Sequence, residues 1–177
     1  MDYSIFKDTL VDQPYPEIEA SINQNACVLL PVSVVEEHGP HLCTGTDIYL
    51  TQTLCQKVKQ KLEDQNQKVL IAPPFYWGVN SITDGFVGSF SIKPETMTMM
   101  LLEILENLKK WGFKKIFLLN FHGDFLHIKT IAAIVAKANA KNTEAYFLID
   151  RHLISRIDLN QDASYLIPVE LDPNKAN

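Results

Sequence analysis

Cysteine is scarce in this chain, and its spacing does not suggest a disulfide or metal-binding role. The three residues Cys27, Cys43 and Cys55 are an odd number and show no Cys-x-x-Cys spacing. Neither a disulfide framework nor a cysteine-based zinc site is therefore indicated. Only Cys43, which lies between His38 and Asp47, could take part in chemistry.

Long apolar runs and an excess of positive charge are also missing. No segment approaches the roughly 18 apolar residues that a membrane span requires, and the N-terminal segment has no basic region before a long apolar stretch. With 16 basic and 21 acidic residues, the net charge of -5 gives no electrostatic reason to expect a nucleic acid or an anionic membrane as partner. These absences predict a cytoplasmic protein without membrane or nucleic-acid partners.

Glycine-rich phosphate-binding motifs are absent as well. No G-x-G-x-x-G or G-x-x-x-x-G-K-[ST] pattern follows any apolar run, which leaves a nucleotide-binding α/β domain as the weakest interpretation. The length of 177 residues predicts one domain, residues 1–177.

Apolar runs and amphipathic segments alternate along the chain. Short apolar runs, typical of strands buried on both faces, predict strands near residues 26–32, 68–72, 114–119 and 144–149. Helices are predicted from Asp47, from Pro94 to a stop at Gly112, and over 125–141. The packed face of the first helix is predicted at every fourth residue, namely Leu50, Leu54, Val58 and Leu62. This alternation predicts a three-layer α/β/α sandwich with a mainly parallel sheet.

Ionisable side chains are concentrated after two of the predicted strands. The first strand runs into "VEEHGPHLCTGTD", with Glu36, His38 and Asp47, and the third into "NFHGDF", with His122 and Asp124. Residues two apart in an extended segment point to the same side, at the sheet edge where ligands gather. Two imidazoles and three carboxylates suit two divalent ions of the zinc, manganese or iron type, with one carboxylate bridging.

Each of these residues also has a structural explanation. Asp47 could cap the helix that follows it, and the Glu36–Glu37 pair could be solvated. A histidine before glycine is usually a satisfied surface or core residue. The residues alone therefore leave metal binding and a structural role about equally supported.

A long polar and aromatic segment, "YWGVNSITDGFVGSFSIKP", separates the second strand from the second helix. At about twenty residues it is too long for an incidental turn and is a candidate binding loop. Trp77 and Phe86 on this loop are candidates for an apolar wall against a flat substrate, with simple packing as the alternative.

Three segments resemble a known family in order and spacing, over about residues 26–150. "LLPVSVVEEHGPHLCTGTDIYL" resembles the S-x-E-x-H-G-P-H-L-P-x-x-x-D signature of the creatininase (creatinine amidohydrolase) family. "YWGVNSITDGFVGSFSIKPET" and "GFKKIFLLNFHGDF" are similar to two later segments of that family. The resemblance implies that Glu36, His38, Asp47 and His122 are metal ligands, with Asp47 bridging two ions. Asp124 falls where creatininase itself has a ligand glutamate.

The resemblance also implies an activity. It implies a metal-dependent amidohydrolase that uses a metal-activated water on a non-peptide C–N bond of a small cyclic amide or formamide-type substrate. Family members form symmetric oligomers, so self-association is expected. An H-A-G-E-x-E-T-S-like stretch that contributes to the family's active site is not found in this sequence. A non-catalytic metal- and ligand-binding homologue, acting as a sensor or accessory subunit, is therefore the alternative.

Amide hydrolysis also needs a proton donor for the departing nitrogen, and a positioned acid accelerates such a step about 10²- to 10⁴-fold. The candidate donors in the sequence are Glu37, His41, Asp84, His127 and His152. His41 has a second interpretation as a brace for its loop.

Overall fold

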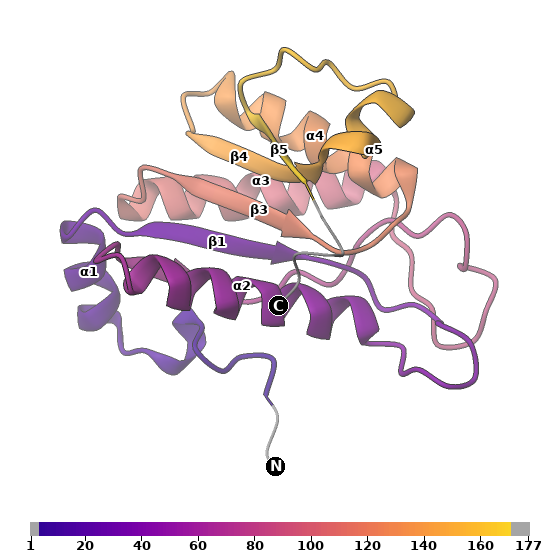
Figure 1. The fold of residues 1–177 in the computed structure, drawn as a ribbon, viewed down its shortest axis with the longest axis horizontal. Coiled ribbons are helices and arrows are strands. Elements are labelled where there is room, and N and C mark those ends of the chain that lie inside the picture. The colour runs from indigo at the N-terminus through magenta and orange to yellow at the C-terminus, as the bar shows by residue number, and fades with distance from the viewer. Residues whose placement is uncertain (1–3, 171–177) are drawn as a thin grey trace.

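The described part of the chain, residues 4–170 in a computed structural model, folds around one parallel β-sheet (Figure 1). The strands are β1 (Cys27–Val32), β2 (Val69–Ile71), β3 (Ile116–Asn120), β4 (Ala145–Asp150) and β5 (Leu166–Val169). Their order across the sheet is β2-β1-β3-β4-β5, and every neighbouring pair is parallel. The four predicted strands and the parallel sheet are confirmed.

Helices cover both faces of the sheet. α3 (Pro94–Trp111) and α4 (Phe125–Asn139) pack against each other on one face, and α2 (Thr46–Glu63) lies on the opposite face next to β1 (Figure 1). Shorter elements complete the described chain: η1 (Leu10–Asp12), α1 (Tyr15–Asn23) and α5 (Arg151–Arg156). The predicted α/β/α sandwich is confirmed.

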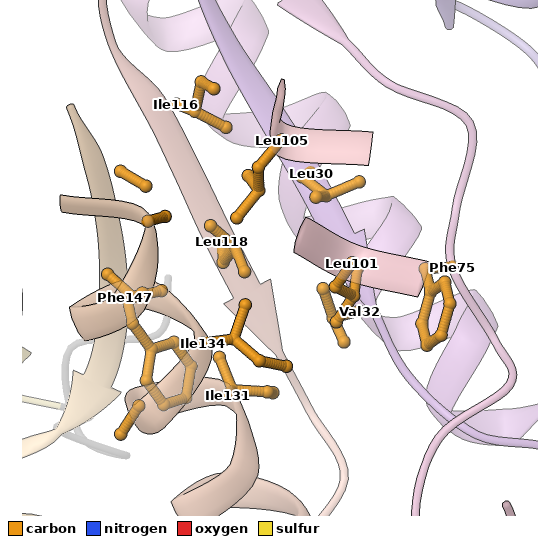
Figure 2. Packing of buried hydrophobic residues seen from close by; sticks show 14 of the residues in the cluster. Leu30, Val32, Phe75, Leu101, Leu105, Ile116, Leu118, Ile131, Ile134 and Phe147 are labelled. Atoms are coloured by element: carbon orange, nitrogen blue, oxygen red, sulfur yellow. The ribbon is translucent and has the colours of Figure 1, made fainter. Parts of the chain in front are cut away.

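The larger hydrophobic core lies between the sheet and the α3–α4 layer. α3 begins at Pro94 and ends at Gly112, whose φ of 112° is accessible to glycine at little cost. Its fully buried Leu101 and Leu105 face Leu30 and Leu118 of the two central strands (Figure 2). Both strands are thus fixed by apolar contacts on this face, which determines where their carboxyl ends lie.

The packed face of α2 differs from the prediction. Leu50 is 44% exposed, while Thr51 and Gln52 are fully buried, so the prediction for Leu50 is wrong. The Ser33 hydroxyl contacts the Thr51 hydroxyl at 2.9 Å, and Thr51 donates to the Asp47 carbonyl at 2.7 Å. These polar contacts turn the start of the helix so that Asp47 faces the end of β1.

β5 is not predicted by the apolar pattern because it is short and contains Pro168, which has no N–H for a strand ladder. Such a residue is tolerated at the edge of a sheet, where β5 lies. Within residues 4–170, none of the helices combines the length and apolar character needed to cross a membrane.

Candidate metal centre

The two loops predicted to carry metal ligands meet at the carboxyl ends of β1 and β3. These strands are neighbours, with Val32 opposite Asn120 in the register. The chain segments that follow them therefore emerge side by side, one carrying Glu36 and His38 and the other carrying His122. Asp47 joins them from the first turn of α2.

Four of the five predicted ligands lie in contact. His122 Nδ1 is 2.9 Å from Glu36 Oε1 and 3.0 Å from Asp47 Oδ2. His38 Nε2 is 3.1 Å from Asp47 Oδ1 and 3.9 Å from Glu36 Oε1. The two oxygens of Asp47 thus face one imidazole each.

The centre is buried and carries negative charge. Glu36, Asp47 and His122 are 9%, 4% and 3% exposed. Burial acts to lower the pKa of His122, but the hydrogen bond to Asp47 and the charges of Glu36, Asp47 and Asp124 outweigh it, so this pKa is raised. Two buried carboxylates this close to one another favour a cation between them.

The hydrogen bonding of His38 shows that these side chains fit a divalent ion. His38 Nδ1 lies 3.1 Å from the carbonyl oxygen of Glu36, which can only accept, so Nδ1 carries a proton. In the neutral ring the lone pair of Nε2 then points at a carboxylate oxygen of Asp47. Imidazoles that bind metals are commonly oriented in this way, by donating the other ring N–H to a backbone carbonyl.

The carboxylate of Asp124 has different partners. Its Oδ1 accepts the N–H groups of Leu126 and His127, at 2.7 and 3.0 Å, and so caps the start of α4. Its Oδ2 accepts both the N–H and the hydroxyl of Ser81, each at 2.6 Å. Burial acts to raise the pKa of Asp124, but these hydrogen bonds outweigh it and lower the pKa. No contact of this carboxylate with the other four predicted ligands is observed among the described residues.

The long loop after β2 makes hydrogen bonds to Glu36 and to its neighbours. The Thr83 hydroxyl donates to Glu36 Oε2 at 2.7 Å, and the Ser89 hydroxyl accepts the N–H of Glu37 at 2.9 Å. The loop also binds Asp124 through Ser81 and His127 through Val79. Sequence reasoning proposed this loop as a ligand-binding segment but missed these Ser and Thr contacts, because hydrogen-bonding partners distant in the sequence leave no periodic signal.

His127 lies directly behind His122. Its ring is fully buried and makes an edge-to-face contact with the His122 ring, with 5.0 Å between centroids. Its Nδ1 accepts the N–H of Val79 at 3.2 Å. Burial, and next the charge of His122, lower the pKa of His127 to about 3. A neutral, buried imidazole is poorly suited to the proton-donor role considered for His127.

The other predicted site residues have varied surroundings. Glu37 Oε2 accepts the N–H of Gly39 at 2.8 Å, and His41 is exposed on the same loop. His152, in the first turn of α5, lines a groove of about 490 Å³ together with His122. Trp77 packs edge-on against Phe90, and Phe86 is 59% exposed. The catalytic and substrate-binding roles of these residues stay predictions.

Comparison with known proteins identifies the family. The creatininase model, described as creatinine amidohydrolase, matches residues 12–170. The chain belongs to the creatininase family. A mycofactocin precursor peptide peptidase of Mycolicibacterium smegmatis is 29% identical over 119 residues, which cover 67% of this chain and 47% of the relative. A creatinine amidohydrolase of Pseudomonas putida is 29% identical over 128 residues, covering 69% and 46%.

Solved structures of this family share the fold. A structure named as a manganese creatininase matches with a TM-score of 0.69 at 19% identity, covering 92% of this chain and 58% of the other. This member of the creatininase family spans about half the length of the curated relatives that it matches.

The close approach of Gly78 to His127 predicts that a larger side chain at position 78 destabilises the fold. A Cβ at Gly78 would collide with the His127 ring and lie 2.5 Å from Val34 Cγ1, whereas a Cβ at Gly85 would meet nothing within 4 Å. We expect Gly78→Ala to lower the free energy of unfolding by about 1–3 kcal/mol through overpacking. Urea unfolding of metal-free protein measures this, with Gly85→Ala as the matched control. An unchanged midpoint for Gly78→Ala would contradict the packing described.

The low pKa of His127 predicts a loss of stability in acid. Between its unfolded pKa of about 6.5 and its folded pKa of about 3, the unfolded state binds the extra proton, so stability falls as the pH falls. From pH 6.5 to 4.5 this amounts to about 2–3 kcal/mol. Urea unfolding of EDTA-treated protein at both pH values should show a smaller difference for His127→Phe. Equal pH dependence in the two proteins would rule out this assignment.

Proposed function

We propose that this protein is a metal-dependent amidohydrolase that cleaves the C–N bond of an amide. The observation that carries the proposal is the contact of Glu36, His38, Asp47 and His122 at the ends of two neighbouring strands. A cluster of two imidazoles and two nearly buried carboxylates has little structural reason to form without a cation. Membership of the creatininase family supports the same reaction class.

The proposed cofactor is a pair of divalent ions of the zinc, manganese or iron type. Solved creatininases include a manganese form and a Zn–Zn form of a mutant, which supports these metals. A divalent ion held at this centre would supply a Lewis acid, which acidifies water and polarises an amide carbonyl. Asp47 would be shared by the two positions, with His38 in one and His122 in the other, and Glu36 lies near both imidazoles.

Side chains next to the ligands fix their orientation. The Thr83 hydroxyl binds Glu36 Oε2 and leaves Oε1 directed at His122. The Asn120 side chain donates to the carbonyl of His122 at 2.7 Å and accepts its N–H at 3.0 Å, which fixes the turn after β3. Ligands held in this way lose little conformational freedom when the metal binds.

The departing nitrogen requires a proton, and we propose His152, Glu37 or His41 as its source. His152 has the strongest support, because it lines the same groove as His122. Trp77 and Phe86 are proposed to contact a flat substrate from the long loop, where both side chains are exposed.

The proposed substrate is a small cyclic amide or a formamide-type compound. The creatinine amidohydrolase relative supports this class. A short peptide is the second candidate, because a peptide peptidase is an equally similar relative. A cytoplasmic location and a lack of nucleic-acid partners stay predictions from the sequence.

The activity is tested on protein loaded with zinc, manganese or iron, against cyclic ureides, lactams, formamides and short peptides. We expect hydrolysis by the wild type and loss of both metal binding and turnover in Asp47→Ala. Because losing an outer-shell partner already costs about 10- to 100-fold, losing a shared ligand should cost more. Asp64→Ala, at the far end of α2, is the control. Metal binding without turnover of any amide would instead favour the non-catalytic homologue.

We also propose that the protein self-associates through the loop at residues 82–90. Ile82 is 71% exposed, and Phe86, Val87 and Phe90 on the same loop are also exposed. Apolar side chains gathered on one exposed segment often mark an interface. Light scattering at micromolar concentration should give a multiple of 20.1 kDa, and Val87→Asp should reduce it. A wild-type particle of 20.1 kDa would contradict the proposal.

A further inference from the structure

The carboxylate of Asp124 is saturated by hydrogen bonds from the protein itself. A carboxylate offers about four acceptor positions. In Asp124 they accept the N–H groups of Leu126 and His127 and both the N–H and the hydroxyl of Ser81. The residue is 1% exposed, so replacement of these donors by water is disfavoured. For Asp124 to bind a metal, either the cap of α4 or the contact with Ser81 must break.

Without Asp124, the two metal positions have unequal ligand sets. Glu36 Oε1 and Asp47 Oδ2 both contact His122 Nδ1, while Glu36, Asp47 and His38 also offer ligand atoms that all lie within 4.8 Å of one another. Both positions thus depend on the same atom, Glu36 Oε1, which lies 2.9 Å from His122 Nδ1 and 3.9 Å from His38 Nε2. Catalytic zinc sites typically have three protein ligands, and the position that does not take Glu36 has only two.

The contacts of Asp124 instead connect it to Glu36. Asp124 holds Ser81, and Thr83, two residues further along the loop, holds Glu36 Oε2. The backbone N–H of His127 donates to Asp124, and the His127 ring accepts the N–H of Val79 on the same loop. The start of α4 thus hydrogen-bonds the loop at Val79 and Ser81, and the loop in turn orients Glu36.

We propose that Asp124 is a positioning residue and not a metal ligand, so that the centre binds one divalent ion tightly and a second ion much more weakly. The tight position takes Glu36, Asp47 and one of the two imidazoles, and the weak position has only Asp47 and the other imidazole. This inference rests on the proposed metal centre and concerns how its two positions are filled. It differs from the role that the family resemblance implies for position 124.

Metal titration in the absence of substrate tests the inference. EDTA-treated protein is titrated with Co²⁺, followed by visible absorption and by calorimetry, and metal content is measured after dialysis. We expect one tightly bound ion per chain and a second ion at least about tenfold weaker. Glu36→Ala should remove the tight ion, whereas Asp124→Ala should retain it with an affinity reduced by up to about 10-fold through the loop.

Variants that leave Asp124 intact separate the two roles. Ser81→Ala removes one hydrogen bond to Asp124 without touching any ligand, so it should weaken the tight ion in the same direction as Asp124→Ala. Asp124→Asn keeps an oxygen for the helix cap and should recover part of the affinity lost in Asp124→Ala. Asp150→Ala, which removes an equivalent cap from α5, is the control and should leave metal binding unchanged.

Three results would overturn the inference. The first is wild-type binding of two ions with affinities within tenfold of each other. The second is loss of one ion in Asp124→Ala or Asp124→Asn while Ser81→Ala behaves as wild type, because this pattern is expected of a ligand. The third is no tight binding in the wild type, which would overturn the metal centre and the proposed function together. Failure to hydrolyse amides would affect only the proposed function.

Discussion

The contact of His122 Nδ1 with the carboxylates of Glu36 and Asp47 connects three segments that are distant in the sequence. It depends on the parallel pairing of β1 with β3, since a shift of register by one residue would turn the side chains after each strand to the opposite face. The apolar core beneath these strands maintains the register. The chemistry at the sheet edge therefore depends on packing between the sheet and α3 and α4.

The loop after β2 connects Glu36 to the layer of helices. It contacts Glu36 through Thr83, and it contacts the start of α4 through Ser81 and Val79. Movement of this loop would therefore disturb both the orientation of Glu36 and the cap of α4. The same loop therefore links the side chain of Glu36 to the start of α4.

Much of the fold and part of the centre could be predicted from the sequence. The strands and the α3 helix follow from apolar runs and from Pro94 and Gly112, and the Glu36–His38 spacing correctly placed both side chains on one side. The i, i+2 spacing directs His122 and Asp124 to the same space, but it could not predict that the Asp124 carboxylate accepts hydrogen bonds from the start of α4 and from Ser81. Likewise, Leu50 follows a helical repeat but is exposed, since buried Thr51 and Ser33 decide how α2 is turned. Competing polar partners, invisible to periodicity, account for both differences.

The two edge strands of the sheet limit how two molecules of this protein can associate. β2 has three residues and forms one edge, while β5 forms the other and contains Pro168, which has no N–H to offer a new strand. Short strands and edge proline both discourage pairing between sheets of separate molecules. A continuous sheet shared by two chains is therefore disfavoured, and contacts between molecules are left to side chains outside the strand ladder. The short β2 and the proline in β5 therefore disfavour edge-to-edge pairing between the parallel sheets of two molecules.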